Sequence, residues 1–317
     1  MKIRSLLLLF FLLSIGASAF GQSYMVDIVR DSARSDKFTG GRIEKTALAA
    51  GDGNLKITIN VPAFQMTLWQ NGKEVRSYPI GVGLLDYPIM IGRLEASSVQ
   101  WNPVWIPPSS DWIEKSSTVK AGEIILPTDP RNPLGKVKIP LGYGYLIHQA
   151  KGDGDMGNLV SHGCIRVMQK DLYDLAEKIV SARSLDVTPD QIVEAKRTKI
   201  TVIGQLEPIV PVEITYDTMV IEAGRLHIYP DVYNYKKNTV ANLRKDLRTN
   251  GIDDSGISDA ALAKMIASAS AKKQFVVDAA ILETGNALKS GKVIPVLPAQ
   301  NEVKSKSSLI KRRTARR

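Results

Sequence analysis

The chain has 317 residues, with 42 lysines and arginines, 32 aspartates and glutamates, one cysteine and three histidines. Hydrophobic residues make up 44%, aromatic residues 6% and charged residues 23%, which excludes a disordered polyelectrolyte and a polytopic membrane protein. The formal charge of +10 is concentrated at the ends: Lys2 and Arg4 precede any acidic residue, and the segment from Glu302 to Arg317 has seven basic residues and one acidic residue. The remaining chain is nearly neutral, which argues against a nucleic-acid partner.

The first 19 residues have the pattern of an export signal. Lys2 and Arg4 precede an apolar run from Leu6 to Leu13, and Ala17-Ser18-Ala19 supplies the small residues that signal peptidase requires. The run is too short to span a bilayer, and no later stretch reaches 18 uninterrupted apolar residues, so we expect no integral membrane segment. The mature protein is therefore expected to work in the periplasm, or outside the cell at the wall.

The pattern becomes regular at Leu55. Residues 20–54 are polar and small, and we expect a linker or weakly ordered arm there. Apolar residues then alternate with polar ones from Leu55 to Val61, which predicts a half-buried strand. A second alternation from Phe64 leads into Asn71-Gly72 and a further apolar run, which is typical of a two-residue hairpin turn because both turn positions need a positive φ.

Residues 100–143 are rich in tryptophan and proline. Prolines at this density disfavour a long helix and predict ordered loops over a sheet. The preferred interpretation of Trp101, Trp105 and Trp112 is that they anchor these loops to the core, and the alternative is a surface that binds sugar rings.

Beyond residue 164 the spacing changes. Leu172, Leu175, Ala176 and Ile179 have the spacing of one helix face, and a strand is expected at Lys199–Ile203. A late hairpin follows, with strands at Ile214–Ile221 and Leu226–Tyr229 that turn near Gly224.

The last part of the chain is predicted to be helical. Val240, Leu243 and Leu247 share one helix face, and Ser258 is a suitable N-cap for a second helix, with Ile257 and Leu262 as a hydrophobic staple. The basic tail has no apolar face, which predicts disorder. The expected divisions are a signal peptide (1–19), a linker (20–54), a main domain (55–205), a hairpin extension (206–235), a helical C-terminal region (236–292) and a disordered tail (293–317).

Cys164 is the strongest functional signal. A structural cysteine in an exported protein normally has a partner, so a single thiol there indicates that its reactivity is used. A thiolate is a nucleophile, and the nearby imidazole of His162 can remove the thiol proton. Gly163 lets a substrate backbone come close, main-chain N–H groups at such a turn can stabilise an oxyanion, and Arg166 adds a fixed positive charge.

His148 is the second candidate base. It closes the apolar run Tyr145-Leu146-Ile147, and a loop of glycines and aspartates can fold it back beside Cys164. The sequence leaves the choice between His148 and His162 open, because residues two apart in an extended segment face the same side. His227 has no chemically active neighbours and is interpreted as structural. We expect no metal or other cofactor, since the spacing typical of zinc ligands is absent.

These residues resemble a known family. Ser161-His162-Gly163-Cys164-Ile165-Arg166, preceded by Ile147-His148, is similar to the motif of the YkuD-type L,D-transpeptidases. Phe64–Gly83 resembles the opening hairpin of that family, Asn102–Pro108 its Asn-Pro-x-Trp-x-Pro-Pro segment, and Asn132-Pro133-Leu134-Gly135 its Asn-Pro-Leu-Gly turn. The resemblance covers roughly residues 55–180, and Pro211–Asp231 is similar to an extension found in some members. Residues 89–93 depart from the family's usual Pro-Thr-Gly element.

The resemblance implies a mostly-β catalytic domain, a sandwich or barrel with one or two short helices, that remodels peptidoglycan through a cysteine acyl-enzyme. Cys164 would be the nucleophile and His148 the base, oriented by the backbone carbonyl of Gln149. His162 and Gly163 would line the oxyanion side. Ser161 belongs to the same motif, and Arg166 would support the site or the donor peptide.

The implied partners are peptidoglycan stem peptides, as donor and as acceptor. An acceptor amine on a second stem gives a 3→3 cross-link, a lysine of a lipoprotein gives wall anchoring, and water makes the enzyme an L,D-carboxypeptidase. A second class of function is a non-catalytic wall-binding protein with Trp101, Trp105 and Trp112 as its platform. Such a protein has no need for a free thiol near two histidines.

Overall fold

The computed structural model describes residues 54–184 and 186–297. The predicted export signal, the predicted linker up to residue 53 and the tail beyond residue 297 lie outside the described residues, and the predictions for them stay predictions. None of the helices in the described part of the chain has the length and hydrophobicity that a membrane span requires.

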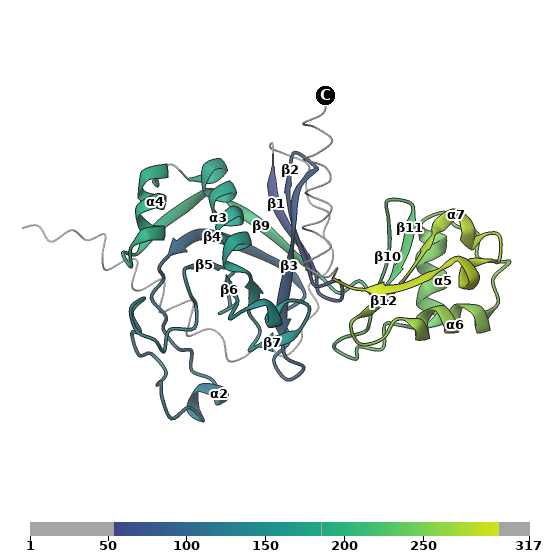
Figure 1. Cartoon of the computed structure of the whole chain (residues 1–317), viewed down its shortest axis with the longest axis horizontal. Coiled ribbons are helices and arrows are strands. Elements are labelled where there is room, and N and C mark those ends of the chain that lie inside the picture. The colour runs from purple at the N-terminus through teal and green to yellow at the C-terminus, as the bar shows by residue number, and fades with distance from the viewer. Residues whose placement is uncertain (1–53, 185, 298–317) are drawn as a thin grey trace, which may run out of the picture.

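Most of the strands form one closed barrel (Figure 1). The strand order is β2-β1-β9-β4-β5-β6-β8-β3, and β3 pairs again with β2, which closes the sheet, while β7 adds to β3. The mostly-β fold class is thereby confirmed. In chain order these strands are β1 (Leu55–Asn60), β2 (Gln65–Gln70), β3 (Lys73–Gly83), β4 (Gly92–Trp101), β5 (Val137–Pro140), β6 (Leu146–Gln149), β7 (Leu159–Ser161), β8 (Ile165–Val167) and β9 (Val202–Thr215).

The first strands follow the predicted pattern. Buried and partly exposed residues alternate along β1, because its inner face packs into the barrel. Asn71 and Gly72 form the turn between β2 and β3 with φ values of 53° and 73°, as the Asn-Gly pair predicts.

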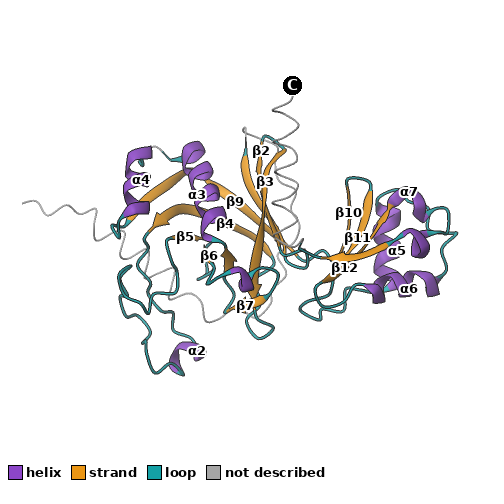
Figure 2. Cartoon of the chain, viewed as in Figure 1, coloured by secondary structure: helices purple, strands orange, loops and turns teal. Residues whose placement is uncertain are grey.

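Two helices follow the strands that carry the Cys164 motif, and they lie together beside the barrel (Figure 2). The helix α3 (Gln169–Arg183) buries Leu172, Leu175, Ala176 and Ile179, the residues that predicted it, and packs against β9 and β5. The helix α4 (Pro189–Arg197) begins with a capping box between Thr188 and Gln191.

The segment rich in tryptophan and proline consists mainly of loops, as predicted, with the short helix α2 (Asp111–Glu114). A further short helical turn, η1 (Asp153–Asp155), lies in the loop between β6 and β7. Trp101 is fully buried in the barrel core, while Trp105 packs in a separate small core with Ile113 and Ile125. The tryptophans therefore anchor this segment, and Trp101 is excluded from any surface platform.

The predicted boundary at residues 205 and 206 is wrong, because it falls inside a single strand. β9 runs from Val202 to Thr215 and pairs antiparallel with β4 and parallel with β1. Ile214 therefore belongs to the barrel and not to the late hairpin. That hairpin is shorter than predicted, with β10 (Met219–Glu222) and β11 (Arg225–Ile228).

The C-terminal region is not purely helical. Its helices α5 (Val240–Thr249) and α6 (Asp259–Ser268) start at Thr239 and Ser258, whose side chains cap them. Two strands follow, β12 (Lys273–Asp278) and β13 (Lys292–Pro295), which extend the hairpin into an antiparallel sheet in the order β10-β11-β12-β13. The short helices α7 (Ala279–Leu282) and α8 (Ala287–Ser290) connect them. The tail predicted from residue 293 therefore starts too early.

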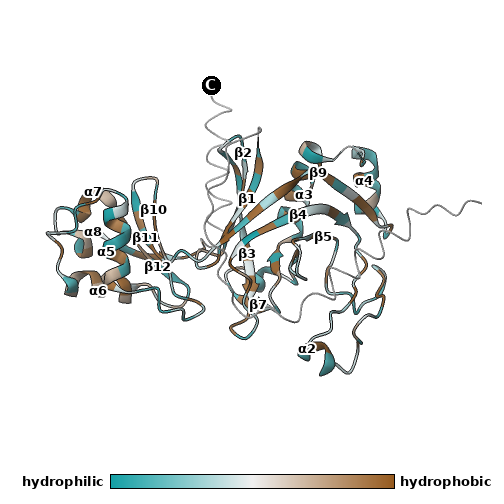
Figure 3. Ribbon diagram, turned by 180° about the vertical axis from the view of Figure 1, so that it is seen from behind, coloured by the Kyte–Doolittle hydropathy of each residue, from teal (hydrophilic) through white to brown (hydrophobic). Residues whose placement is uncertain are grey.

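The helices of this region pack on its sheet around a second core, which includes Leu226, Leu243, Leu262 and Phe275. Figure 3 shows the hydrophobic stretches of these helices and strands in brown.

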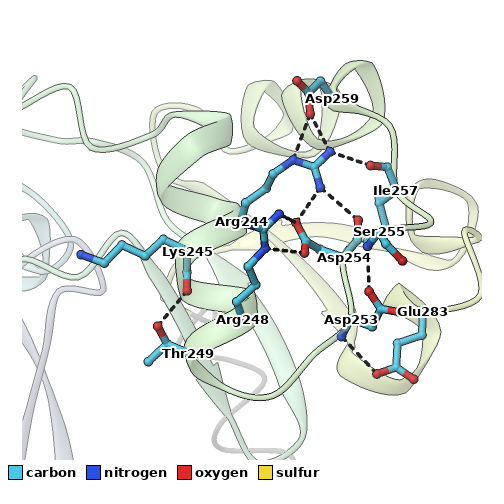
Figure 4. Close-up of polar contacts among 10 residues, drawn as sticks. All are labelled: Arg244, Lys245, Arg248, Thr249, Asp253, Asp254, Ser255, Ile257, Asp259 and Glu283. Carbon is cyan, nitrogen blue, oxygen red and sulfur yellow. Dashed lines mark hydrogen bonds and ion pairs between the residues drawn. The ribbon is translucent and has the colours of Figure 1, made fainter.

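A buried carboxylate fixes the start of α6 to α5. Asp254 is 3% exposed and accepts hydrogen bonds from Arg244 Nη1 at 2.6 Å and Arg248 Nε at 2.8 Å (Figure 4). Hydrogen bonds from the two guanidinium groups lower the pKa of Asp254 to about 2. Arg244 also binds Asp259 in the first turn of α6.

The connection between the two parts contacts the barrel near the Cys164 turn. The buried hydroxyl of Tyr233 donates to the Gly83 carbonyl at 3.0 Å, and its backbone N–H donates to the hydroxyl of Tyr216. The Tyr216 hydroxyl in turn donates to Asp231. This segment therefore holds the end of β3, which lies directly against Gly163.

Candidate active site

Cys164 lies in the tight turn between β7 and β8 and is partly exposed. The hydroxyl of Ser161, at the end of β7, donates to the Cys164 carbonyl at 2.5 Å and closes the turn. Gly163 has a φ of 104°, and a Cβ there would lie 3.0 Å from the Tyr145 ring. Both its backbone conformation and this close approach favour glycine at position 163.

The thiol of Cys164 is protonated at neutral pH. Burial raises its pKa to about 11, although a backbone hydrogen bond from Leu146 and the positive charge of Arg166 both oppose the rise. The contact with Leu146 also places the sulfur beside strand β6, which carries His148 two residues farther on.

His148 is buried and neutral. Burial and the nearby charge of Arg166 lower the pKa of His148 to about 3, and only 4% of the side chain is exposed. The Gln149 backbone is close enough to raise this pKa, but Nδ1 of His148 has no hydrogen-bond partner of normal geometry among the described residues. A neutral imidazole with a free nitrogen is able to accept a proton.

His162 is held differently, on the exposed side of the turn. Its ring stacks on Trp112 of α2, with centroids 4.3 Å apart and planes 5° apart, and the edge of Tyr87 meets it at 4.7 Å. Trp105 stacks behind Trp112 at 6.4 Å. Partial burial and Arg166 lower the pKa of His162, so this imidazole is also predominantly neutral at pH 7.

Arg166 is a fixed positive charge beneath the site. It is 8% exposed, and its Nη1 lies 3.0 Å from the carboxylate of Asp155 in η1. The same carboxylate accepts a hydrogen bond from the Lys151 backbone, so the loop between β6 and β7 is fastened to β8.

Gln149 has a different side-chain role from the residues above. Its side-chain carbonyl accepts a hydrogen bond from the Lys136 backbone N–H at 2.8 Å. The backbone N–H of Gln149 donates to the Leu134 carbonyl. The side chain thus holds the Asn132–Gly135 turn, and Gly135 leaves room for it. Gln149 and Gly163 are not among the residues that line the cavity described next.

A cavity of about 1140 Å³ lies between the Cys164 turn and the loops that follow β4. The predicted site residues in its wall are His148, Ser161, His162, Cys164 and Arg166. Trp105 and Trp112 line it from the loop side. Among the described residues, no group of histidine, cysteine and carboxylate side chains is suited to hold a metal ion.

Sequence reasoning missed several parts of this site. Tyr87 and Tyr145 pack against His162 and Gly163, Asp155 pairs with Arg166, and Lys138 lines the cavity. Tyr145 and Asp155 lie close to His148 and Cys164 in the sequence, but nothing in the pattern distinguished them from their neighbours. Tyr87 reaches the site from the loop after β3, and Lys138 through the pairing of β5 with β6.

Residues 54–203 match the sequence profile of the YkuD family, the L,D-transpeptidase catalytic domain. YbiS of Escherichia coli K12, named a probable L,D-transpeptidase, is 30% identical over 127 residues, which cover 39% of this chain and 41% of that protein. YcfS of the same organism, also named a probable L,D-transpeptidase, is 29% identical over 139 residues, 41% of this chain and 43% of that protein. The chain thus matches about two fifths of the length of these relatives.

Among solved structures, an L,D-transpeptidase from Mycobacterium smegmatis aligns with 51% of this chain and 58% of its own, at 15% identity and a TM-score of 0.34. L,D-transpeptidase 1 from Mycobacterium tuberculosis aligns with 51% of this chain and 61% of its own, at 17% identity and a TM-score of 0.31. Likenesses this distant assign neither a substrate nor an activity.

Proposed function

We propose that the protein is an exported peptidoglycan L,D-transpeptidase that works through an acyl-enzyme on Cys164, because residues 54–203 match the YkuD family of L,D-transpeptidase catalytic domains. One observation carries this proposal. The only cysteine of the chain lies at the cavity wall, in the turn before β8, beside the strand that holds a neutral, buried imidazole.

In the first step, the Cys164 sulfur attacks the carbonyl between the diamino residue and the terminal D-Ala of a tetrapeptide stem. The thiol proton moves to the imidazole as the S–C bond forms, because a thiol with a pKa of about 11 is rarely ionised beforehand. The C–N bond then breaks, and the imidazolium returns the proton to the leaving amine of D-Ala. In this proposal, main-chain N–H groups of the turn that carries Cys164 stabilise the oxyanion.

In the second step, the thioester passes to an acceptor. An amine of a second stem attacks the acyl carbon, the C–S bond breaks, and a 3→3 cross-link forms as the thiol regains a proton. A lysine of a lipoprotein would give wall anchoring instead, and water would give a free tripeptide stem. The acceptor is selected by the shape of the loops and by water exclusion, since the nucleophile is the same in each case.

The structure favours His148 over His162 as the base. Cys164 contacts the backbone of the strand that carries His148, and the imidazole of His148 retains a free nitrogen. The ring of His162 is stacked on Trp112 and flanked by Tyr87, which suits a residue that lines the substrate path.

The product assay tests this proposal. The mature protein is incubated with a disaccharide-tetrapeptide, and the products are followed by mass spectrometry, with Cys164→Ala as the paired variant. A cross-linked dimer with release of D-Ala supports transpeptidation, and release of D-Ala without a dimer identifies a carboxypeptidase. If no product depends on Cys164, the enzymatic function is wrong.

A further inference from the structure

One tyrosine of the connection between the barrel and the C-terminal region reaches the end of β3. Tyr233 follows β11, is 6% exposed and packs in the core of the barrel. Its hydroxyl donates to the carbonyl of Gly83, the last residue of β3, at 3.0 Å. A residue that lies outside the matched segment 54–203 therefore makes a buried polar contact within the barrel.

The same hydroxyl contacts both ends of the loop after β3. Burial raises the pKa of the Tyr233 hydroxyl, and a backbone hydrogen bond from Ile89 opposes the rise. Between Gly83 and Ile89, the Tyr87 N–H donates to the Leu84 carbonyl at 3.0 Å and closes a turn. Tyr233 therefore fastens this loop where it leaves β3 and again where it ends.

The fastened loop lies against the Cys164 turn. A Cβ on Gly83 would lie 3.0 Å from the Cα of Gly163, so the two main chains are in direct contact. The Leu84 N–H donates to the Ser161 carbonyl at 2.8 Å, next to this contact. A shift of the end of β3 would therefore displace the main chain of the Cys164 turn.

The proposed reaction is sensitive to such a displacement. An oxyanion forms when the sulfur attacks the donor carbonyl, and again when the acceptor attacks the thioester. Donors that stabilise an oxyanion must be aimed at it, and misplacement by about 1 Å can cost about 100-fold in rate. Gly83, Gly163 and Tyr233 are not among the residues that line the cavity, so donor binding does not depend on their side of the turn. A misaligned turn should lower kcat and leave KM unchanged.

We propose that Tyr233 is a positioning residue of the active site, which aligns the main chain of the Cys164 turn through the loop after β3. This proposal rests on the transpeptidase function proposed above. Tyr233 is itself held from the C-terminal side, because its N–H donates to the Tyr216 hydroxyl and that hydroxyl donates to Asp231, both at 2.6 Å. The connection to the C-terminal region thereby supports catalysis without contacting the sulfur or the donor.

The test uses the full chain and three variants that each remove one hydroxyl: Tyr233→Phe, Tyr216→Phe and the control Tyr229→Phe. Tyr229 is a buried tyrosine of the same connection, and its ring lies beside His227. Release of D-Ala from a disaccharide-tetrapeptide gives kcat and KM. The rate of Cys164 alkylation by iodoacetamide reports on the thiol alone, because that substitution forms no oxyanion.

Tyr233→Phe is expected to lower kcat by roughly 10- to 100-fold while KM and the alkylation rate stay unchanged. Tyr216→Phe should show the same pattern with a smaller loss, and Tyr229→Phe should match the wild type. A merely structural hydroxyl would lower the melting temperature and leave kcat unchanged in the folded protein.

The proposal is overturned if Tyr233→Phe keeps the wild-type kcat, whatever its melting temperature, or if Tyr229→Phe loses as much. It is also overturned if alkylation slows as much as D-Ala release, because the thiol itself would then be altered. Should Tyr233→Phe fail to fold, Tyr216→Phe decides by the same comparison. If the wild type releases no D-Ala that depends on Cys164, the transpeptidase function itself fails, and the positioning role with it.

Discussion

At the level of single residues, the two groups proposed to react, the Cys164 thiol and the His148 imidazole, are both uncharged at neutral pH. Burial raises the pKa of Cys164 to about 11 and lowers that of His148 to about 3. Between these two values the site contains a thiol and an uncharged imidazole. The proposed mechanism therefore requires proton transfer during the attack, in contrast to enzymes that hold a preformed thiolate beside an imidazolium.

This state predicts how the free protein reacts with iodoacetamide. Below its pKa the thiol loses a proton more often as the pH rises, so the alkylation rate of Cys164 should increase about tenfold per pH unit from pH 6 to 9 and level off only near 11. Intact-mass measurements are unambiguous because the chain has one cysteine. A rate that is constant from pH 5 to 8 would indicate a preformed thiolate and contradict this description.

The three histidines are predicted to differ in how much their replacement lowers the proposed activity. We expect His148→Asn to lower kcat for D-Ala release by roughly 10²- to 10⁴-fold, the usual contribution of a general base. His162→Asn should cost less than about 10-fold, the upper end of a lost ring stack, because its ring is held by Trp112. His227→Asn is the control, since this residue pairs with Gln274 in the second sheet. A larger loss for His162→Asn than for His148→Asn would reverse the assignment.

At the level of elements, the short helix α2 connects the loops after β4 to the turn before β8. Trp112 stacks on His162, and Trp105 stacks behind it. Replacing Trp112 by alanine should lower kcat/KM by roughly 3- to 10-fold, the worth of one aromatic stack, without changing the melting temperature of the barrel.

Glu114→Ala, at an exposed position of the same helix, should leave kcat/KM unchanged. If Trp112→Ala and Glu114→Ala lower kcat/KM equally, the stack of Trp112 on His162 does not position His162. A melting temperature that falls together with kcat/KM would mean that Trp112 supports the barrel and not the site.

The sequence predicted best what neighbouring residues determine. Asn71-Gly72 forms its turn, and Leu172 and Leu175 face the core from α3, because turn geometry and helical spacing are local properties. The same holds for the Cys164 turn, whose residues are consecutive. The run Phe275-Val276-Val277 was missed as a strand because a short apolar run fits a buried helix equally well.

Properties that depend on pairing between distant strands could not be predicted. The extension of β9 to Thr215 depends on its parallel pairing with β1, which is distant in the sequence. Cys164 was predicted as the nucleophile from its being the only cysteine, next to His162, and the resemblance to a known family favoured His148 as the base.

At the level of the whole molecule, the barrel and the C-terminal sheet have separate hydrophobic cores. Leu262 is fully buried in the second core. Leu262→Ala should destabilise that sheet and its helices by about 2–5 kcal/mol. Hydrogen exchange read by mass spectrometry should then become faster in β10–β13 and α5–α6, and stay unchanged in the barrel strands.

Lys264→Ala, at an exposed position of the same helix, should leave the exchange of both parts unchanged. If Leu262→Ala accelerates exchange throughout the barrel, the two cores unfold as one unit, and the contact between Tyr233 and Gly83 couples them more strongly than their separation indicates.

The most direct test of the central claim is the intact mass of the protein after brief incubation with a disaccharide-tetrapeptide. The proposed mechanism predicts a mass increase equal to the donor minus D-Ala, located on Cys164 and absent from Cys164→Ala. No mass increase, with no release of D-Ala that depends on Cys164, would contradict it.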